Sequence, residues 1–371
     1  MAFTTINDPS AYFQVALYTG TGSNQSITNG GNSNLQPEWV WVKDRSATND
    51  HKITDSSRLA NSKPSITLES NTANAEYDDA DPMSTDSFDS DGFTIGTNGN
   101  YNTNTNTYVA WQWKANGGTT TTNDASATSV GTIDSVYQAN TTAGFSIVTH
   151  TGTGANGTIA HGLGVAPNVI LLKCRSNAGS SWMMFHTGLG NNAKTLSLDA
   201  NDAEVTESSP YYSFNNTAPT STVFSVGAGN TTNGSSRTFV TYCFAEIKGY
   251  SKFGAYTGNG DNDGTFQFTG FQPSWLMIKR TDSSTNGNWW IHDTKRDVFN
   301  VGSRTIKADT SAAEVNSSDQ YVDLFSNGFK LRNGNNSQNG NTNSYVYMAF
   351  AGRPFVTSKG TPNTAGVIKL T

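Results

Sequence analysis

The sequence predicts an all-β protein made of three tandem antiparallel β-sandwich domains with a jelly-roll-like topology. Three observations support this fold class. A similar segment recurs three times along the 371 residues. No stretch shows the apolar stripe at positions i, i+3, i+4 and i+7 that is typical of an amphipathic helix. Short runs of β-branched and aromatic residues, bounded by Gly, Asn, Asp and Pro, recur instead and are typical of strands.

The recurring segment contains a Thr-Gly pair, then a proline, then an apolar run that ends in a lysine. Its prolines are Pro37, Pro167 and Pro273, which lie 130 and 106 residues apart. Units of about 20–50 residues would indicate a solenoid, whereas units above ~100 residues have the size of whole domains. We therefore expect three domains, at residues 13–116 (repeat 1), 143–246 (repeat 2) and 253–351 (repeat 3).

The run after each proline is apolar on both faces, which is typical of a strand that is covered on both sides. These runs are Trp39–Val42, Val169–Leu172 and Trp275–Ile278. Each repeat closes on a strand that alternates instead, with large apolar side chains such as Trp111 and Trp113 on one face and smaller or polar ones on the other. We expect the large face to pack into the core of its own sandwich.

Three further segments lie outside the repeats. We expect residues 1–12 to form an N-terminal arm, 117–142 to form a polar linker whose middle, 130–137, pairs with a neighbouring strand, and 352–371 to form a C-terminal tail. Only residues 245–252 join repeats 2 and 3. These lengths predict that repeats 2 and 3 move as a unit, that repeat 1 hinges, and that the arm or repeat 1 is the anchor.

Composition excludes several classes of function. The net charge is −6 without a basic stripe, so nucleic acid is not an expected partner. No stretch approaches the ~20 apolar residues of a membrane helix, so membrane insertion is not expected. The N-terminus lacks the features of a signal peptide, which predicts synthesis in a cytoplasm. Cys174 and Cys243 are too few for a disulfide scaffold and are expected to be free thiols, since a disulfide between them would need neighbouring strands.

The motifs predict a non-enzymatic protein without a cofactor, since no nucleophile, zinc or phosphate-loop signature occurs. The densest acidic cluster contains weak calcium candidates, because calcium prefers six to eight oxygen atoms from loops. A glycosidase-type pair is an alternative, but we favour a solvated loop because repeat 2 has no counterpart. The calcium candidates are Asp86, Asp89 and Asp91, and the same cluster includes Asp78, Asp79 and Asp81.

Two further sets of residues are singled out. Trp182, Trp289 and Trp290 are weak candidates for binding, because exposed rings can stack on sugars; core packing is the default, and an interface role is an alternative. A lysine also recurs in every repeat with an arginine one or two residues behind it, and an Ala-Glu pair recurs as well. We expect structural ion pairs inside each copy: Lys43 or Arg45 with Glu76, and Lys279 with Glu314.

Four segments carry a resemblance to a known family: Met1–Phe13, Ser87–Phe93, Tyr108–Ala115 and Tyr345–Phe355. The resemblance itself covers nearly the whole chain. These segments resemble a domain family of tailed phages of marine bacteria, including cyanophages and pelagiphages. This chain has Gly352-Arg353 where the family more often has Glu-Asn. The resemblance implies a virion structural protein of the tail-fibre or decoration type, and it implies no activity and no site residues.

These observations together predict a structural protein on the surface of the virion, assembled in the host cytoplasm. Its expected partners are other virion proteins, either the major capsid protein or tail proteins, and self-association as a trimer suits a fibre. Capsid decoration and tail or fibre attachment are alternatives. A receptor-binding tail protein that recognises a host-surface glycan is the other alternative.

Overall fold

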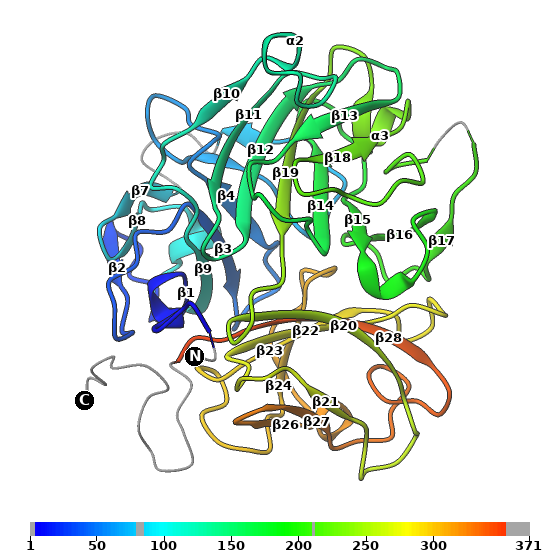
Figure 1. Cartoon of the computed structure of the whole chain (residues 1–371). Helices are drawn as coiled ribbons and strands as arrows, with labels where there is room; N and C mark the ends of the chain where they lie inside the picture. Colours follow the sequence, from blue (N-terminus) through cyan, green and yellow to red (C-terminus); the bar gives the residue numbers. More distant parts are fainter. Residues whose placement is uncertain (1–3, 79–84, 210–211, 354–371) are drawn as a thin grey trace.

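The computed structural model describes residues 4–78, 85–209 and 212–353 (Figure 1). The predicted all-β antiparallel fold is confirmed. Within this part of the chain, the α-helices have four residues each: α1 (Gly99–Asn102), α2 (Ala125–Thr128) and α3 (Asn230–Asn233). None of these helices is long and apolar enough to cross a membrane. Most of the predicted C-terminal tail, residues 354–371, lies outside the described residues.

Repeat 1 forms a larger sheet in the order β1-β9-β3-β4 and a smaller sheet in the order β2-β8-β7, beside a short β5-β6 pair. Its first strand pairs with its last, and its second strand with its next to last, which is the nested pairing of a jelly-roll-like sandwich. The strands are β1 (Phe13–Thr19), β2 (Gln25–Thr28), β3 (Trp39–Asp44), β4 (Lys52–Asp55), β5 (Ile66–Thr67), β6 (Tyr77–Asp78), β7 (Thr85–Asp89), β8 (Gly92–Ile95) and β9 (Thr107–Trp113).

Repeats 2 and 3 follow the same order. Their larger sheets contain β12-β19-β14-β15-β16-β17 and β20-β28-β22-β23-β24-β25, and their smaller sheets contain β13-β18 and β21-β27-β26. The strands of repeat 2 are β12 (Phe145–Thr151), β13 (Gly157–Ala160), β14 (Val169–Cys174), β15 (Met183–His186), β16 (Lys194–Ser197), β17 (Val205–Thr206), β18 (Val223–Val226) and β19 (Thr238–Phe244). Those of repeat 3 are β20 (Ser251–Thr257), β21 (Phe266–Phe268), β22 (Trp275–Arg280), β23 (Trp289–Asp293), β24 (Arg304–Lys307), β25 (Val315–Asn316), β26 (Val322–Phe325), β27 (Gly328–Leu331) and β28 (Ser344–Phe350).

The larger sheet of each repeat is covered on both faces, as the apolar runs predict. In β3, Val40 and Val42 face the smaller sheet of repeat 1 and pack with Phe93. Trp39 and Trp41 point the other way, into a core that all three repeats share. Because alternate residues of a strand point to opposite faces, one run of four apolar residues serves both cores.

The shared core corrects the expectation for the closing strands. Their large side chains do not fill the sandwich of their own repeat; they meet the large side chains of the other two repeats instead. These residues are Val109, Trp111 and Trp113 of β9, Val240, Tyr242 and Phe244 of β19, and Val346, Met348 and Phe350 of β28. Their smaller neighbours, such as Ala110 and Cys243, face the individual sandwiches. Both cysteines are buried free thiols, as predicted.

Three equivalent backbone contacts arrange the repeats in a ring. Glu76 N–H donates to the Arg175 carbonyl (2.8 Å), and Glu204 N–H donates to the Thr281 carbonyl (2.7 Å). The ring closes where Glu314 N–H of repeat 3 donates to the Arg45 carbonyl of repeat 1 (2.9 Å). Each repeat therefore contacts the other two in the same sense, so that one chain has the arrangement of a trimer (Figure 1).

The predicted hinge, linker and arm are wrong. The 117–142 segment forms β10 (Thr121–Asn123) and β11 (Ser135–Asn140), which extend the larger sheet of repeat 2 beside β12. The predicted pairing of its middle is confirmed for Ser135–Tyr137. Ile6 of the expected arm belongs to the shared core and is buried. Repeat 1 contributes four tryptophans to that core, so it is packed against the other two repeats and does not hang from them by a linker.

Candidate functional site

The tryptophans considered for sugar stacking do not offer a free face. Trp182 is 0% exposed, Trp289 is 1% exposed and Trp290 is 6% exposed. Trp182 and Trp289 belong to the shared core, while the ring of Trp290 lies 4.9 Å from Lys307 Nζ. Sugar stacking on these three rings is therefore excluded by their burial, and the alternative of an interface role describes the first two.

Trp182 and Trp289 occupy equivalent positions in repeats 2 and 3, and the ring at this position forms a hydrogen bond with the main chain of another repeat. Trp182 Nε1 donates to the Glu69 carbonyl at 2.8 Å, and Trp289 Nε1 donates to the Ser197 carbonyl at 2.9 Å. His51 occupies the same position in repeat 1. Its Nδ1 accepts from Trp41, so its Nε2 carries the proton that it donates to a carbonyl of repeat 3 at 2.9 Å.

The arginine that follows the repeated lysine pairs with the repeated glutamate of another copy and not with that of its own copy. Arg45 of repeat 1 binds Glu314 of repeat 3 through two hydrogen bonds of 2.9 Å. Arg175 of repeat 2 binds Glu76 of repeat 1 at 2.8 Å. These ion pairs are structural, as expected, but the predicted partners within one copy were wrong. A repeated acid and a repeated cation can also meet between neighbouring copies of a ring.

The three repeated lysines bind backbone carbonyls. Lys43 Nζ donates to the Asp44 carbonyl at 2.6 Å, Lys173 Nζ donates to the Ser180 carbonyl, and Lys279 Nζ donates to the Asp202 carbonyl of repeat 2 at 2.7 Å. Burial lowers the pKa of each lysine to about 8. The amines of Lys43 and Lys173 hold loops of their own repeat in place, and the amine of Lys279 joins repeats 2 and 3.

A buried aspartate–arginine pair lies at two of the three interfaces. Asp55 binds Arg58 at 2.6 Å and accepts a hydrogen bond of 2.6 Å from the Tyr242 hydroxyl of repeat 2. Asp293 binds Arg296 at 2.5 Å in the same way, and the indole N–H of Trp111 in repeat 1 donates to it at 3.0 Å. Both pairs are fully buried and satisfied by a neighbouring repeat, so their chemistry is structural.

The acidic residues considered for calcium have separate partners. Asp86 binds Lys63 at 2.6 Å. Asp89 accepts from the hydroxyls of Ser87 and Thr94, and Asp91 accepts from a backbone N–H. Among the described residues, no group of three or more His, Cys, Asp and Glu side chains is placed to hold a metal. The calcium candidates are therefore not brought together; Asp79 and Asp81 of the same cluster lie outside the described residues.

The outer face of repeat 3 differs from the rest of the surface. Every exposed phenylalanine among the described residues lies there, and Phe268 and Phe299 are 61% and 83% exposed. The ring of Phe266 lies 6.4 Å from that of Phe325, and its tip lies above Gly328, where a side chain would leave it no room. The segment that carries Phe299 runs beside β26, because Asn300 binds the backbone of Leu324.

We name this surface the repeat 3 apolar patch and define it by Phe266, Phe268, Val298, Phe299, Val301 and Phe325. Sequence reasoning missed it, although a signal exists. The strand pairing aligns Phe266 and Phe268 with Ser26 and Thr28 of repeat 1, because Phe268 pairs with Gly328 as Thr28 pairs with Gly92. Phenylalanines where another copy has hydroxyl side chains indicate a surface specific to one repeat.

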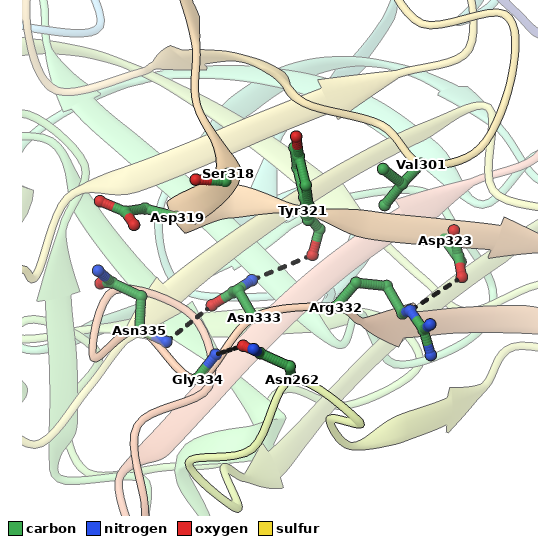
Figure 2. A pocket seen from close by; sticks show the side chains of 10 residues that line it. All are labelled: Asn262, Val301, Ser318, Asp319, Tyr321, Asp323, Arg332, Asn333, Gly334 and Asn335. Atoms are coloured by element: carbon green, nitrogen blue, oxygen red, sulfur yellow. Dashed lines mark hydrogen bonds and ion pairs between the residues drawn. The ribbon is translucent and has the colours of Figure 1, made fainter.

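A polar hollow of about 610 Å³ adjoins the patch at Val301 (Figure 2). Arg332 binds Asp323 at 3.3 Å on one side of it, and Asn333 donates to the Tyr321 carbonyl at 3.0 Å on the other. The hollow is lined by Asn262, Val301, Ser318, Asp319, Tyr321, Asp323, Arg332, Asn333, Gly334 and Asn335. It combines amides, hydroxyls, carboxylates and a guanidinium, which suits a ligand with many hydroxyl groups.

Fold and site define a ring of three β-sandwich repeats whose polar core residues join the copies and whose distinctive surface lies on one of them. Residues 8–354 match the sequence model of a family described as a domain of unknown function (DUF7483), and the chain belongs to this family. One family model spans all three repeats, which agrees with the shared core. No curated protein matches the sequence.

Proposed function

We propose that this protein is a non-enzymatic structural protein on the surface of a phage particle, attached to another virion protein through the repeat 3 apolar patch. The observation that carries the attachment surface is the gathering of exposed phenylalanines on one repeat of a threefold repeated fold. The assignment to a virion rests on the resemblance of the four sequence segments to marine phage proteins.

The patch has the chemistry of a protein interface. Aromatic residues are enriched at the centres of such interfaces, where burial of their rings supplies much of the binding free energy. Phe268 lies on β21, an edge strand of the smaller sheet, so its partner can reach both the ring and the strand edge. In the parts of repeats 1 and 2 that the structure describes, the exposed large apolar residues are four scattered aliphatic side chains, at Leu17, Leu59, Val165 and Val205.

The experiment measures how many copies of the protein are incorporated per particle. We expect F268S combined with F299S to reduce occupancy at least tenfold, by quantitative mass spectrometry against the major capsid protein. The matched control is L59S combined with V205S, which removes two exposed apolar side chains from repeats 1 and 2. Equal occupancy of both double variants would show that the patch is not the attachment surface.

The wild-type copy number distinguishes two forms of the proposal. Hundreds of copies per particle identify a capsid decoration protein, whereas a few to a few dozen place the protein on the tail or at a vertex. Absence of the protein from purified particles would overturn the assignment to a virion.

Binding of a host-surface glycan is a second candidate function, favoured by the polar hollow of repeat 3. Its mix of amide, carboxylate, guanidinium and tyrosine groups suits the hydroxyl groups and apolar faces of sugars. The test compares binding of the wild type, Y321A and R332A to whole host cells and to their purified surface polysaccharide. Binding that both variants lose supports this function, and binding unaffected by either variant dismisses the hollow as the site.

A further inference from the structure

The groove between repeats 2 and 3 is a second hollow of about 280 Å³. Repeat 2 contributes Leu189, Lys194 and Glu204 to its wall, while Thr281 and β20 and β28 line the opposite side. The groove lies beside the backbone contact between Glu204 and Thr281, which is one of the three equivalent contacts of the ring. It can therefore be compared directly with the same place at the other two interfaces.

At each of the other interfaces, the repeated glutamate binds two arginines. Glu76 Oε2 accepts from Arg175 Nε at 2.8 Å and from Arg58 Nη1 at 3.3 Å. Glu314 accepts from Nε and Nη2 of Arg45, both at 2.9 Å. Its second cation is the buried Arg296 of repeat 3, whose Nη1 lies 3.4 Å from Glu314 Oε2. One guanidinium in each pair comes from the same repeat as the glutamate and the other from its neighbour.

Both arginine positions are changed at the interface between repeats 2 and 3. Leu189 stands where repeats 1 and 3 have the buried arginine, and Thr281 stands where Arg45 and Arg175 stand. The backbone contact is unchanged, so the glutamate is in the same place. Lys194 Nζ binds Glu204 Oε1 at 2.5 Å, and no donor from the described residues binds Oε2.

We propose that this groove binds the guanidinium of an arginine side chain presented by another polypeptide. The partner's arginine takes the place that Arg45 holds beside Glu314, with Nε or a terminal nitrogen donating to Glu204 Oε2. The Glu204 side chain is 23% exposed, so it is reachable from solvent and yet partly shielded. This inference does not depend on the proposed virion function, because it rests on a comparison of the three interfaces.

The site should prefer arginine to lysine. A planar guanidinium can bind a carboxylate through two parallel hydrogen bonds, as Arg45 binds Glu314, whereas an ammonium is a single point of charge. Lys194 already supplies one ammonium to Glu204, so a second one adds repulsion without the planar fit.

The test is a methyl-NMR titration of the full chain with N-acetyl-arginine methylamide, and with N-acetyl-lysine methylamide at matched ionic strength. We expect the arginine probe to shift the Leu189 and Thr281 methyl signals in a saturable manner and the lysine probe to bind at least about tenfold more weakly. E204Q should lose at least about tenfold in arginine affinity, since it removes a charge-assisted hydrogen bond. An arginine response that E204Q leaves intact, or an equal response to both probes, would overturn the proposal.

Two variants use the repeats as internal controls. T281R restores the arginine of repeats 1 and 2, and we expect it to fill the groove and abolish the response to the probe. R45T removes the corresponding arginine between repeats 3 and 1, and we expect it to create a second arginine-responsive site beside Glu314. If T281R does not fold, E204Q and R45T still decide the outcome, and an R45T variant without a new response contradicts the equivalence on which the proposal rests.

Discussion

The interfaces between repeats 1 and 2 and between repeats 2 and 3 have the same backbone geometry but different side chains. The first contains Asp55 and Arg58, with the Tyr242 hydroxyl bound to the aspartate. At the second, His186 stands in place of the aspartate and Met348 in place of the tyrosine. His186 Nε2 lies 3.2 Å from the Tyr347 carbonyl and uses the backbone as its partner.

The comparison shows that the aspartate, the arginine and the tyrosine are all replaced together between one interface and the next. An aspartate without its arginine would be an uncompensated buried charge, which is strongly destabilising. A tyrosine hydroxyl without its aspartate would lose its hydrogen-bond partner on burial. Repeat 2 has neither Asp nor Arg at these positions, and the facing residue of repeat 3 is Met348, which needs no partner. Both solutions leave the buried polar groups satisfied.

The largest expected effect comes from removing one member of the buried network that Asp55, Arg58 and Tyr242 form. R58L leaves the buried Asp55 with two hydrogen-bond donors, the Tyr242 hydroxyl and the Ser57 backbone N–H, but without a cation. It also removes the contact of Arg58 with Glu76, so we expect the free energy of unfolding to fall by about 3–5 kcal/mol. Urea denaturation followed by tryptophan fluorescence measures the change.

A triple variant sharpens the comparison. D55H, R58L and Y242M together graft the solution of the second interface onto the first, and we expect the triple variant to be more stable than R58L alone. Residues in one buried network are coupled, so their effects do not add. A triple variant that loses at least the sum of the three single losses would contradict the view that the contacts form a set.

An intermediate effect is expected from acid, because the second interface contains a histidine. Burial lowers the pKa of His186 to about 4, below its usual value of 6.5. The unfolded chain therefore binds a proton more readily than the folded chain between these values, and stability falls as the pH drops from 6.5 towards 4. The maximum contribution of His186 is about 3 kcal/mol.

The other four histidines are buried, with lowered pKa values, and act in the same direction. H186N isolates the contribution of one group. We expect this variant to lose less stability than the wild type between pH 6.5 and 4, measured by urea denaturation at each pH. Parallel curves for the two proteins would show that His186 does not titrate as its burial requires.

The smallest expected effect lies outside the interfaces, at Asp86. Its ion pair with Lys63 is partly exposed, and such pairs contribute about 0–1 kcal/mol. D86N should therefore shift the midpoint of urea unfolding only slightly, and millimolar calcium should leave the melting temperature of the wild type unchanged. A clear rise of the melting temperature with calcium, lost in D86N, would restore the calcium interpretation.

The sequence was sufficient to predict the fold class, together with the strand after each repeated proline and the closing strand of each repeat. The proline-anchored runs and the alternation of Trp111 and Trp113 correctly indicated strands with two distinct faces. It was not sufficient to predict what covers the second face. A hydrophobic pattern reports that a face is buried and does not report whether the cover comes from the same repeat or from another.

The candidate site was less predictable for a related reason. Trp182 could be assigned either to a sugar or to an interface, because one sequence does not reveal exposure. The cation–acid pairs were recognised as structural, yet their partners lie in different copies, as Arg45 and Glu314 do. The repeat 3 apolar patch could have been found by aligning the copies residue by residue, which requires the strand register.

The central claim is that the three repeats fold as one body around a shared core. Differential scanning calorimetry of the full chain tests this claim most directly. A single transition whose calorimetric and van't Hoff enthalpies agree is the predicted result, because no repeat can leave without exposing the core of the other two. Two or more separate transitions, with repeat 1 melting independently of repeats 2 and 3, would contradict it.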